Sequence, residues 1–177
     1  MTDAVVIGGG IIGCSVAVHL LLESPGMRVE VVEPDPTYAL AASPLASGGV
    51  RQLFSRPENV ALSRQTLELI ARWPEFAAVD GEPAPDLQWK RQGYLFIATR
   101  EGTDALAANL ETQRELGADV RWLEPSELAD RYPVFATSDL GPAVLSPDDG
   151  WLDPHAFLQG MRRKAQSLGA AFREDRV

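Results

Sequence analysis

Cysteine is almost absent from this sequence of 177 residues, since Cys14 is the single one. One thiol excludes an internal disulfide framework and any zinc site built from cysteine pairs. We therefore expect a reducing, cytoplasmic setting for the protein. Cys14 falls at the start of an apolar helical segment, where a small buried side chain is expected in preference to a catalytic thiol.

Positive charge is also scarce. Lysine and arginine together number 16 against 25 acidic residues, which gives a net charge of −9. A nucleic-acid surface needs a stripe of basic residues, and the sequence has none. The acidic balance favours solubility and little affinity for anionic membranes. No metal site is expected either, because the carboxylates at Asp148, Asp149 and Asp153 lack the spacing of a calcium loop.

The longest apolar run, from Val5 to Glu23, has roughly the length that spans a bilayer. It lacks the positive segment that precedes the apolar part of a signal peptide. Three successive glycines make it a poor lipid-facing helix, and it is followed by a Ser-Pro-Gly turn and the alternating segment MRVEVVE. We therefore expect no membrane span.

The same run divides into a strand, a turn and a helix, and a second strand follows them. The pattern predicts a buried parallel strand over 3–7, a helix over 11–23 and a strand over 28–33. Between the first strand and the helix lies the motif Gly-x-Gly-x-x-Gly, and the second strand ends in an acid. This is the arrangement of a dinucleotide-binding βαβ unit.

Each residue type in the motif has a physical reason. Gly8 permits a tight turn, Gly10 lets the backbone approach a pyrophosphate, and Gly13 lets the helix pack close to the strand. The first N–H groups of the helix have no internal partners and attract a phosphate. Glu33 is expected to bind the adenosine ribose hydroxyls, which disfavours NADP. The motif alone leaves NAD, FAD and a glycine turn without a ligand open.

The rest of the chain does not continue as a simple nucleotide-binding domain. Residues 34–56 predict a long loop with one helical turn at its start, and 57–79 predict a helix. A Pro/Gly stretch then leads to a β-rich segment with strands near 87–99 and 120–123 and a helix over 101–116. Asp153-Pro154 predicts the start of a helix that ends near Leu168, and a last strand follows.

Four segments resemble, in order, the N-terminal half of the D-amino-acid-oxidase superfamily. They are VVIGGGIIGCSVAVHL…VEVVEPD, ASPLASGGVRQLFSRPENVALS, GYLFIAT and SPDDGWLDPHAFLQGMRRKAQSLGA. The branch they are most similar to contains sarcosine oxidase, dimethylglycine dehydrogenase and glycine oxidase. The second segment and the DG…DP segment are more specific to this branch than the glycine motif.

The resemblance implies an α/β fold: a Rossmann-like FAD-binding βαβ with a partial β-rich substrate-domain insertion. Residues 1–84 and 148–177 would form the incomplete FAD-binding domain, and 85–147 a partial substrate-domain segment. The implied cofactor is FAD and the implied substrate a small amine or amino acid. Hydride would pass to the flavin from the carbon beside nitrogen, the imine would hydrolyse, and oxygen or an electron-transfer partner would reoxidise the flavin.

The resemblance also assigns cofactor-binding residues by position. The pyrophosphate would be held by Gly8, Gly10, Ile11 and Gly13, and the ribose by Glu33. Val177, at the end of the last strand, would bring its backbone to the adenine. The residues beside the flavin end would be Ser43, Ala46, Ser47, Gly48 and Gly49, with Arg51 near it. For Arg51 an ion pair on the loop surface is an equal alternative.

The length departs from the family, whose members are roughly twice as long. The second half would carry most catalytic and substrate-binding side chains, so no catalytic residue is assigned here, and Cys14 does not match a flavin attachment site. We expect a truncated product, a fragment or one piece of a split protein that needs a C-terminal half or a partner subunit. The alternatives are a non-catalytic nucleotide-binding subunit and an NAD-linked dehydrogenase. A flavin-disulfide reductase is disfavoured because it needs a cysteine pair.

Overall fold

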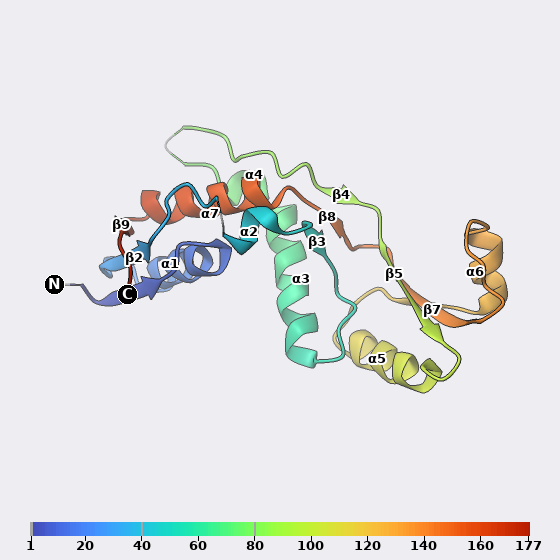
Figure 1. Ribbon diagram of the computed structural model, residues 1–177. Helices are drawn as coiled ribbons and strands as arrows, with labels where there is room; N and C mark the ends of the chain where they lie inside the picture. Colours follow the sequence, from blue (N-terminus) through green and yellow to red (C-terminus); the bar gives the residue numbers. More distant parts are fainter. Residues whose placement is uncertain (1, 40, 80) are drawn as a thin grey trace. The chain divides into compact units, whose positions relative to one another are not determined.

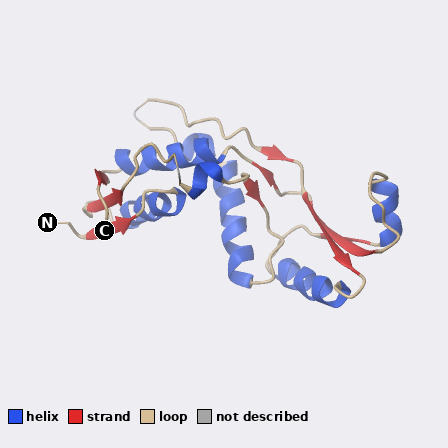
Figure 2. Cartoon of the chain, viewed as in Figure 1, coloured by secondary structure: helices blue, strands red, loops and turns tan. Residues whose placement is uncertain are grey.

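The computed structural model describes residues 2–39, 41–79 and 81–177 of the chain (Figure 1). Helices and strands are interspersed along it (Figure 2), and the fold is mixed α/β, as the sequence predicts. The chain divides into two compact units. The first contains residues 1–48, 72–88 and 152–177, and the second contains residues 49–71 and 89–151. The functional domain boundaries expected from the sequence stay a prediction.

The first unit is built on a parallel sheet with strand order β1-β2-β9. Strands β1 and β2 are joined by α1, which confirms the predicted βαβ unit. The elements of this unit are β1 (Ala4–Ile7), α1 (Ile11–Glu23), β2 (Val29–Glu33), α2 (Ala42–Leu45), α4 (Trp73–Phe76), α7 (Pro154–Ser167) and β9 (Ala171–Glu174).

Helices α1 and α7 pack against each other, and α1 also packs on β1 and β2. The side of α1 that faces inward is small and apolar, and includes the buried Cys14 and Ala17. Helix α7 begins as predicted, because the Asp153 carboxylate accepts hydrogen bonds from the N–H groups of His155 (2.8 Å) and Ala156 (3.1 Å). This cap determines where α7 begins.

The second unit is richer in β-structure. Its sheets have the strand orders β3-β8-β4 and β5-β7-β6, and all of their pairs are antiparallel. One face of β5-β7-β6 packs on α5 around Val144, and the other packs on α6 around Leu128. The elements are β3 (Gly49–Val50), α3 (Pro57–Ala71), β4 (Lys90–Arg91), β5 (Tyr94–Thr99), α5 (Thr103–Glu115), β6 (Arg121–Leu123), α6 (Pro125–Arg131), β7 (Leu140–Ser146) and β8 (Gly150–Trp151).

The structure differs from the sequence prediction at three elements. The helix predicted over 57–79 is two helices, α3 and α4, because Pro74 has no N–H to donate and its ring clashes with the carbonyl four residues earlier. The loop predicted over 34–56 has its helical turn, α2, in the middle and contains strand β3. Strand β1 was predicted to be buried, yet the side chains of Val5 and Ile7 are exposed.

Among the described residues, no helix is long and apolar enough to cross a membrane.

Candidate functional site

The glycine motif forms a tight turn between β1 and α1. Gly8 has φ +91°, a left-handed conformation that favours glycine, and its N–H donates to Val32 O at 2.8 Å. A Cβ on Gly13 would lie 1.8 Å from Gly8 O, so α1 can approach the turn this closely only with glycine there. A Cβ on Gly10 would meet only Ser43 Oγ, at 3.5 Å. The side of Gly10 that would carry a side chain is therefore open.

The start of α1 presents unpaired N–H groups. Its first intrahelical hydrogen bond runs from Cys14 N to Gly10 O at 2.9 Å, so the N–H groups of Ile12 and Gly13 lie ahead of the helical ladder. The N-cap residue, Gly10, has no side chain that could cap the helix, and no acid lies in its first turn. The Ile11 N–H donates to Ser43 Oγ at 3.1 Å, which leaves the Ser43 hydroxyl hydrogen available to a ligand. An anion fits this arrangement.

Glu33 ends β2 beside the glycine turn, at the position predicted for a ribose ligand. Its Oε2 accepts a hydrogen bond from Gly9 N at 2.7 Å and its Oε1 accepts one from Asp35 N at 3.0 Å. Each carboxylate oxygen keeps a further lone pair for a hydroxyl donor. The carboxylate is thus held in a fixed position by the backbone, and its contact with a ribose stays a prediction.

Gly9, between the glycines of the motif, is held by side chains that the sequence did not single out. Cys14 donates its S–H to Gly9 O at 2.9 Å, and a Cβ on Gly9 would lie 3.0 Å from the Tyr38 hydroxyl oxygen. Burial raises the pKa of the Cys14 thiol to about 12, against a smaller opposing effect of the Arg162 charge. Cys14 is therefore a neutral support for the turn, as the expectation of a small buried residue implied.

Tyr38 is the least expected of these residues. It adopts a left-handed φ of +58°, it is fully buried, and burial raises the pKa of its phenol to about 12. The Arg162 guanidinium from α7 stacks on the Tyr38 ring, 5.6 Å from its centroid, and on the Phe172 ring, at 5.4 Å. No sequence motif predicts this stack, because Tyr38 lies in a loop, Arg162 in α7 and Phe172 in β9, far apart along the chain.

The predicted flavin-end residues fall in both compact units, and each unit is described separately. In the first, Ser43 lies in α2, Ala46 N donates to Ser43 O at 3.2 Å, and Ser47 and Gly48 follow. Gly48 has φ +76° and its carbonyl accepts from Leu152 N at 3.0 Å. Ser43 and the residues up to Gly48 thus form one continuous segment, made of α2 and the residues directly after it.

In the second unit, Gly49 lies in β3, where a Cβ would clash with the Tyr94 hydroxyl. The Arg51 guanidinium stacks on Phe54 (4.8 Å to the ring centroid) and Phe96 (5.5 Å). Within the described residues Arg51 makes no ion pair, and its buried Nε has no hydrogen-bond partner.

The next residue, Gln52, is anchored by a buried carboxylate that the sequence left unexplained. Asp149 accepts hydrogen bonds from Gln52 N at 2.9 Å and Gln52 Nε2 at 3.1 Å. Burial is the largest influence on Asp149 and raises the pKa of its carboxyl, although both bonds oppose the rise. This link ties the segment after Gly49 to the β7–β8 turn.

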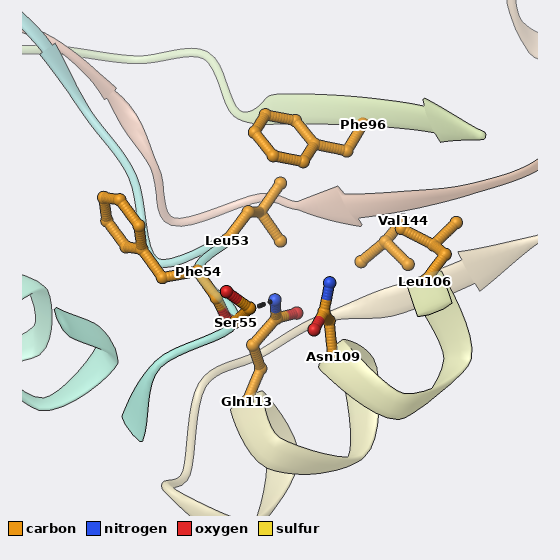
Figure 3. A pocket seen from close by; sticks show the side chains of 8 residues that line it. All are labelled: Leu53, Phe54, Ser55, Phe96, Leu106, Asn109, Gln113 and Val144. Atoms are coloured by element: carbon orange, nitrogen blue, oxygen red, sulfur yellow. Dashed lines mark hydrogen bonds between the residues drawn. The ribbon is translucent and has the colours of Figure 1, made fainter. Parts of the chain in front are cut away.

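A pocket of about 190 Å³ lies in the second unit between α5 and the sheet (Figure 3). Gln113 donates from Nε2 to Phe54 O at 3.0 Å, and its buried Oε1 has no partner among the described residues. Apolar side chains, Ser55 and Asn109 complete the lining of the pocket. The lining contains no acid or base, so the pocket supplies no proton-transfer group of its own.

Val177 was predicted at the end of the last strand. The strand β9 ends at Glu174, so Val177 lies beyond it, with its side chain 85% exposed. The described residues bring together no group of three His, Cys, Asp or Glu side chains suited to a metal ion.

The glycine turn is the part of the molecule that fits a dinucleotide. It combines an open approach at Gly10, N–H groups at a helix start and a fixed acid at the end of the next strand. The pyrophosphate would meet Ile12, Gly13 and Ser43, and the ribose would meet Glu33.

Comparisons with known proteins bear on the family and the fold of the chain. The family model described as DAO, FAD dependent oxidoreductase, matches residues 3–177. The bovine FAD-dependent oxidoreductase domain-containing protein 1 is 40% identical over 180 residues, a match that covers 99% of this chain and 37% of the bovine protein. The chain thus spans little more than a third of the length of that curated relative.

Two solved structures have the same fold. L-proline dehydrogenase from P. horikoshii matches with a TM-score of 0.77 at 28% identity, over 98% of this chain and 44% of its own. Glycine oxidase from Geobacillus kaustophilus matches with a TM-score of 0.74 at 26% identity, over 97% of this chain and 46% of its own.

Proposed function

Because the chain belongs to the DAO family of FAD-dependent oxidoreductases, we propose that it contributes the FAD-binding part of an enzyme that oxidises the C–N bond of an amine or amino acid. The names of the two matched enzymes, a proline dehydrogenase and a glycine oxidase, support this substrate class. The observation that carries the proposal is the glycine turn with its open approach at Gly10 and its fixed carboxylate at Glu33. Family membership also favours FAD over NAD.

The residues of this chain would bind and orient the cofactor. The N–H groups of Ile12 and Gly13 would donate to pyrophosphate oxygens, with the positive end of the α1 dipole behind them. The Ser43 hydroxyl would add a donor, and the free lone pairs of Glu33 would accept from ribose hydroxyls. FAD, when bound, supplies the acceptor for the hydride that leaves the substrate carbon beside nitrogen.

The remaining assignments rest on the family resemblance and are part of the proposal. Ile11 would lie at the pyrophosphate, and Val177 would bring its backbone to the adenine. In the segment after α2, the residues proposed to follow the flavin end of the cofactor are Ala46, Ser47, Gly48, Gly49 and Arg51. Small side chains and glycines suit such a segment because they let the backbone approach a flat ring closely.

The test is a titration of the purified chain with FAD, followed by flavin fluorescence, with NAD as a competitor. We expect binding that saturates at one FAD per chain, weakened at least tenfold by Gly10→Ala, while NAD displaces little. A folded chain that takes up no FAD, or one that prefers NAD, would contradict the proposal.

A second candidate is a nucleotide-binding subunit without catalysis of its own, because the glycine turn supplies groups that bind a cofactor and no catalytic side chain is assigned beside them. The two candidates differ in the fate of bound FAD. Anaerobic addition of sarcosine, glycine or proline bleaches the flavin absorbance if the chain is catalytic and leaves it unchanged if the chain only binds.

We also propose a cytoplasmic location, because the single thiol of Cys14 suits a reducing compartment. Cell fractionation with antibodies against the chain tests it, and recovery in a membrane or secreted fraction would contradict it.

A further inference from the structure

The Tyr38 side chain lies directly beside the glycine turn. A Cβ placed on Gly9 would lie 3.0 Å from the Tyr38 hydroxyl oxygen and 3.1 Å from Glu33 Cβ. Tyr38 and the stem of Glu33 therefore flank the same side of Gly9. Gly9 and Glu33 are also joined directly, because the Gly9 N–H donates to Glu33 Oε2 at 2.7 Å. A shift of the Tyr38 ring would therefore change the surroundings of the Gly9 peptide and of the Glu33 carboxylate.

The loop that carries Tyr38 is closed on Asp35. The Asp35 carboxylate accepts hydrogen bonds from Thr37 N at 3.0 Å and from Ala39 N at 2.9 Å. The Asp35 carbonyl accepts one from Tyr38 N at 2.9 Å. Tyr38 has a φ of +58° in this turn, a conformation that is unfavourable for a residue with a large side chain. Such a residue persists only where its surroundings determine its conformation, so the contacts of the buried ring matter for the loop.

The Tyr38 ring is held from α7 by Arg162. The guanidinium lies 5.6 Å from the centroid of the Tyr38 ring and 5.4 Å from that of Phe172 in β9. Its buried Nε has no hydrogen-bond partner among the described residues. Burial raises the pKa values of Cys14 and Tyr38, and the nearby Arg162 charge opposes both rises. A desolvated guanidinium attracts an aromatic face more strongly than an exposed one does, so Arg162 links α7 and β9 to the loop beside the turn.

We propose that Arg162 is a positioning residue for the nucleotide site, acting through the Tyr38 ring to hold Gly9 and Glu33 where a dinucleotide requires them. The inference rests on the proposed function, since it concerns the site at which the chain would bind FAD. Arg162 itself does not touch the cofactor. Its guanidinium stays on the ring, and Glu33 with the N–H groups at the start of α1 would make the contacts. The alternative is a purely structural role, in which the stack stabilises the unit without affecting the turn.

Fluorescence titration with FAD compares Arg162→Met with Arg163→Met. Arg163 is the matched control: it follows Arg162 in α7 and its Nε is also buried without a partner among the described residues, but its guanidinium donates to Pro83 O at 2.9 Å. We expect Arg162→Met to weaken FAD binding about three- to tenfold, since apparent affinity falls with the fraction of molecules that hold the turn. Arg163→Met should bind FAD like the wild type. Arg162→Lys keeps the charge without the planar stack and should weaken binding less; it also carries the comparison if Arg162→Met does not fold.

A double-mutant cycle with Glu33→Gln separates positioning from packing. If Arg162 acts through the acid, Arg162→Met should weaken FAD binding by less than about twofold further in the Glu33→Gln chain, because the effects of coupled residues are not additive. Tyr38→Leu, which removes the aromatic face, should behave like Arg162→Met. Additive losses in the cycle, or wild-type affinity in Arg162→Met, would overturn the proposal.

Hydrogen exchange of the chain without FAD makes the outcome separable from that of the proposed function. The Gly9 amide should exchange at least about threefold faster in Arg162→Met, because its bond to Glu33 Oε2 opens more often. The Ala156 amide, which donates to Asp153 Oδ1 at the start of the same helix, should be unchanged. Faster exchange at both amides, or at neither, would overturn the positioning role. A wild-type chain that takes up no FAD, with exchange at Gly9 still dependent on Arg162, would count against the proposed function alone.

Discussion

Replacing Gly13 by alanine should lower stability, whereas replacing Gly10 by alanine should weaken cofactor binding. A Cβ on Gly13 would lie 1.8 Å from Gly8 O and 3.0 Å from Gly8 C. A Cβ atom essentially never lies within 3.0 Å of a non-bonded heavy atom, so α1 would have to move by about 1.2 Å away from the turn. On Gly10 the nearest atom is Ser43 Oγ at 3.5 Å, an ordinary contact.

The magnitudes follow from these contacts. Forcing a methyl group into packed structure costs about 1–3 kcal/mol, and the helix propensity of alanine returns up to roughly 1 kcal/mol. We expect Gly13→Ala to lower the free energy of unfolding by about 2 kcal/mol, which is a fall in Tm of roughly 4–8 °C for a chain of this size. Gly10→Ala should change it by less than about 1 kcal/mol, since the cap and entropy effects oppose each other.

FAD binding should affect the two variants in the opposite order to stability, with Gly10→Ala as the weaker binder. Gly10→Ala places a methyl group where the backbone must approach the pyrophosphate, so it should weaken FAD binding at least tenfold, about 1.4 kcal/mol, in a fully folded protein. Thermal unfolding followed by circular dichroism and FAD titration by fluorescence check both effects. An unchanged Tm for Gly13→Ala, or wild-type FAD affinity for Gly10→Ala, would refute the reasoning from the turn.

Three further predictions concern the groups around the turn and the Asp149 link. Glu33→Gln leaves one acceptor oxygen where two now accept from the backbone, so FAD affinity by fluorescence titration should fall roughly tenfold, and unchanged affinity would exclude a ribose contact. Burial raises the pKa values of Cys14 and Tyr38 to about 12, so the folded chain binds these two protons more tightly than the unfolded chain does. Stability should therefore fall as pH rises from about 9 towards 12, less steeply in Cys14→Ala, and a thiol reagent should label native Cys14 only on unfolding. Asp149→Ala leaves the Gln52 donors without an acceptor and should lower the free energy of unfolding, measured with urea, by about 1–3 kcal/mol. Asp149→Asn keeps an acceptor and should lower it less. Equal losses of unfolding free energy in the two variants would contradict this.

The sequence was sufficient where a local pattern determines the structure. The spacing of Gly8, Gly10 and Gly13 after an apolar strand requires a turn and a helix start, and the structure has both. Asp153 before Pro154 predicts a capped helix, and its carboxylate makes the cap. In each case the determining contacts lie within a few residues of each other along the chain.

The sequence was insufficient where the contact is distant or the backbone unusual. Tyr38 adopts a left-handed φ without the glycine that normally signals it, and its ring meets Arg162 from more than a hundred residues later in the sequence. The support of Gly9 by Cys14 depends on how α1 lies against the turn. Residue types alone do not encode such placements, because the same types occur in ordinary loops and helices.

Strand β1 shows a different limit, one that concerns the whole sheet. Its uninterrupted apolar sequence is what a parallel strand covered on both faces requires, so the sequence predicts burial. The structure partly buries Ala4 and Val6 and leaves Val5 and Ile7 exposed on the other face. The residues thus carry the composition of an interior strand in a unit that supplies only one covering layer.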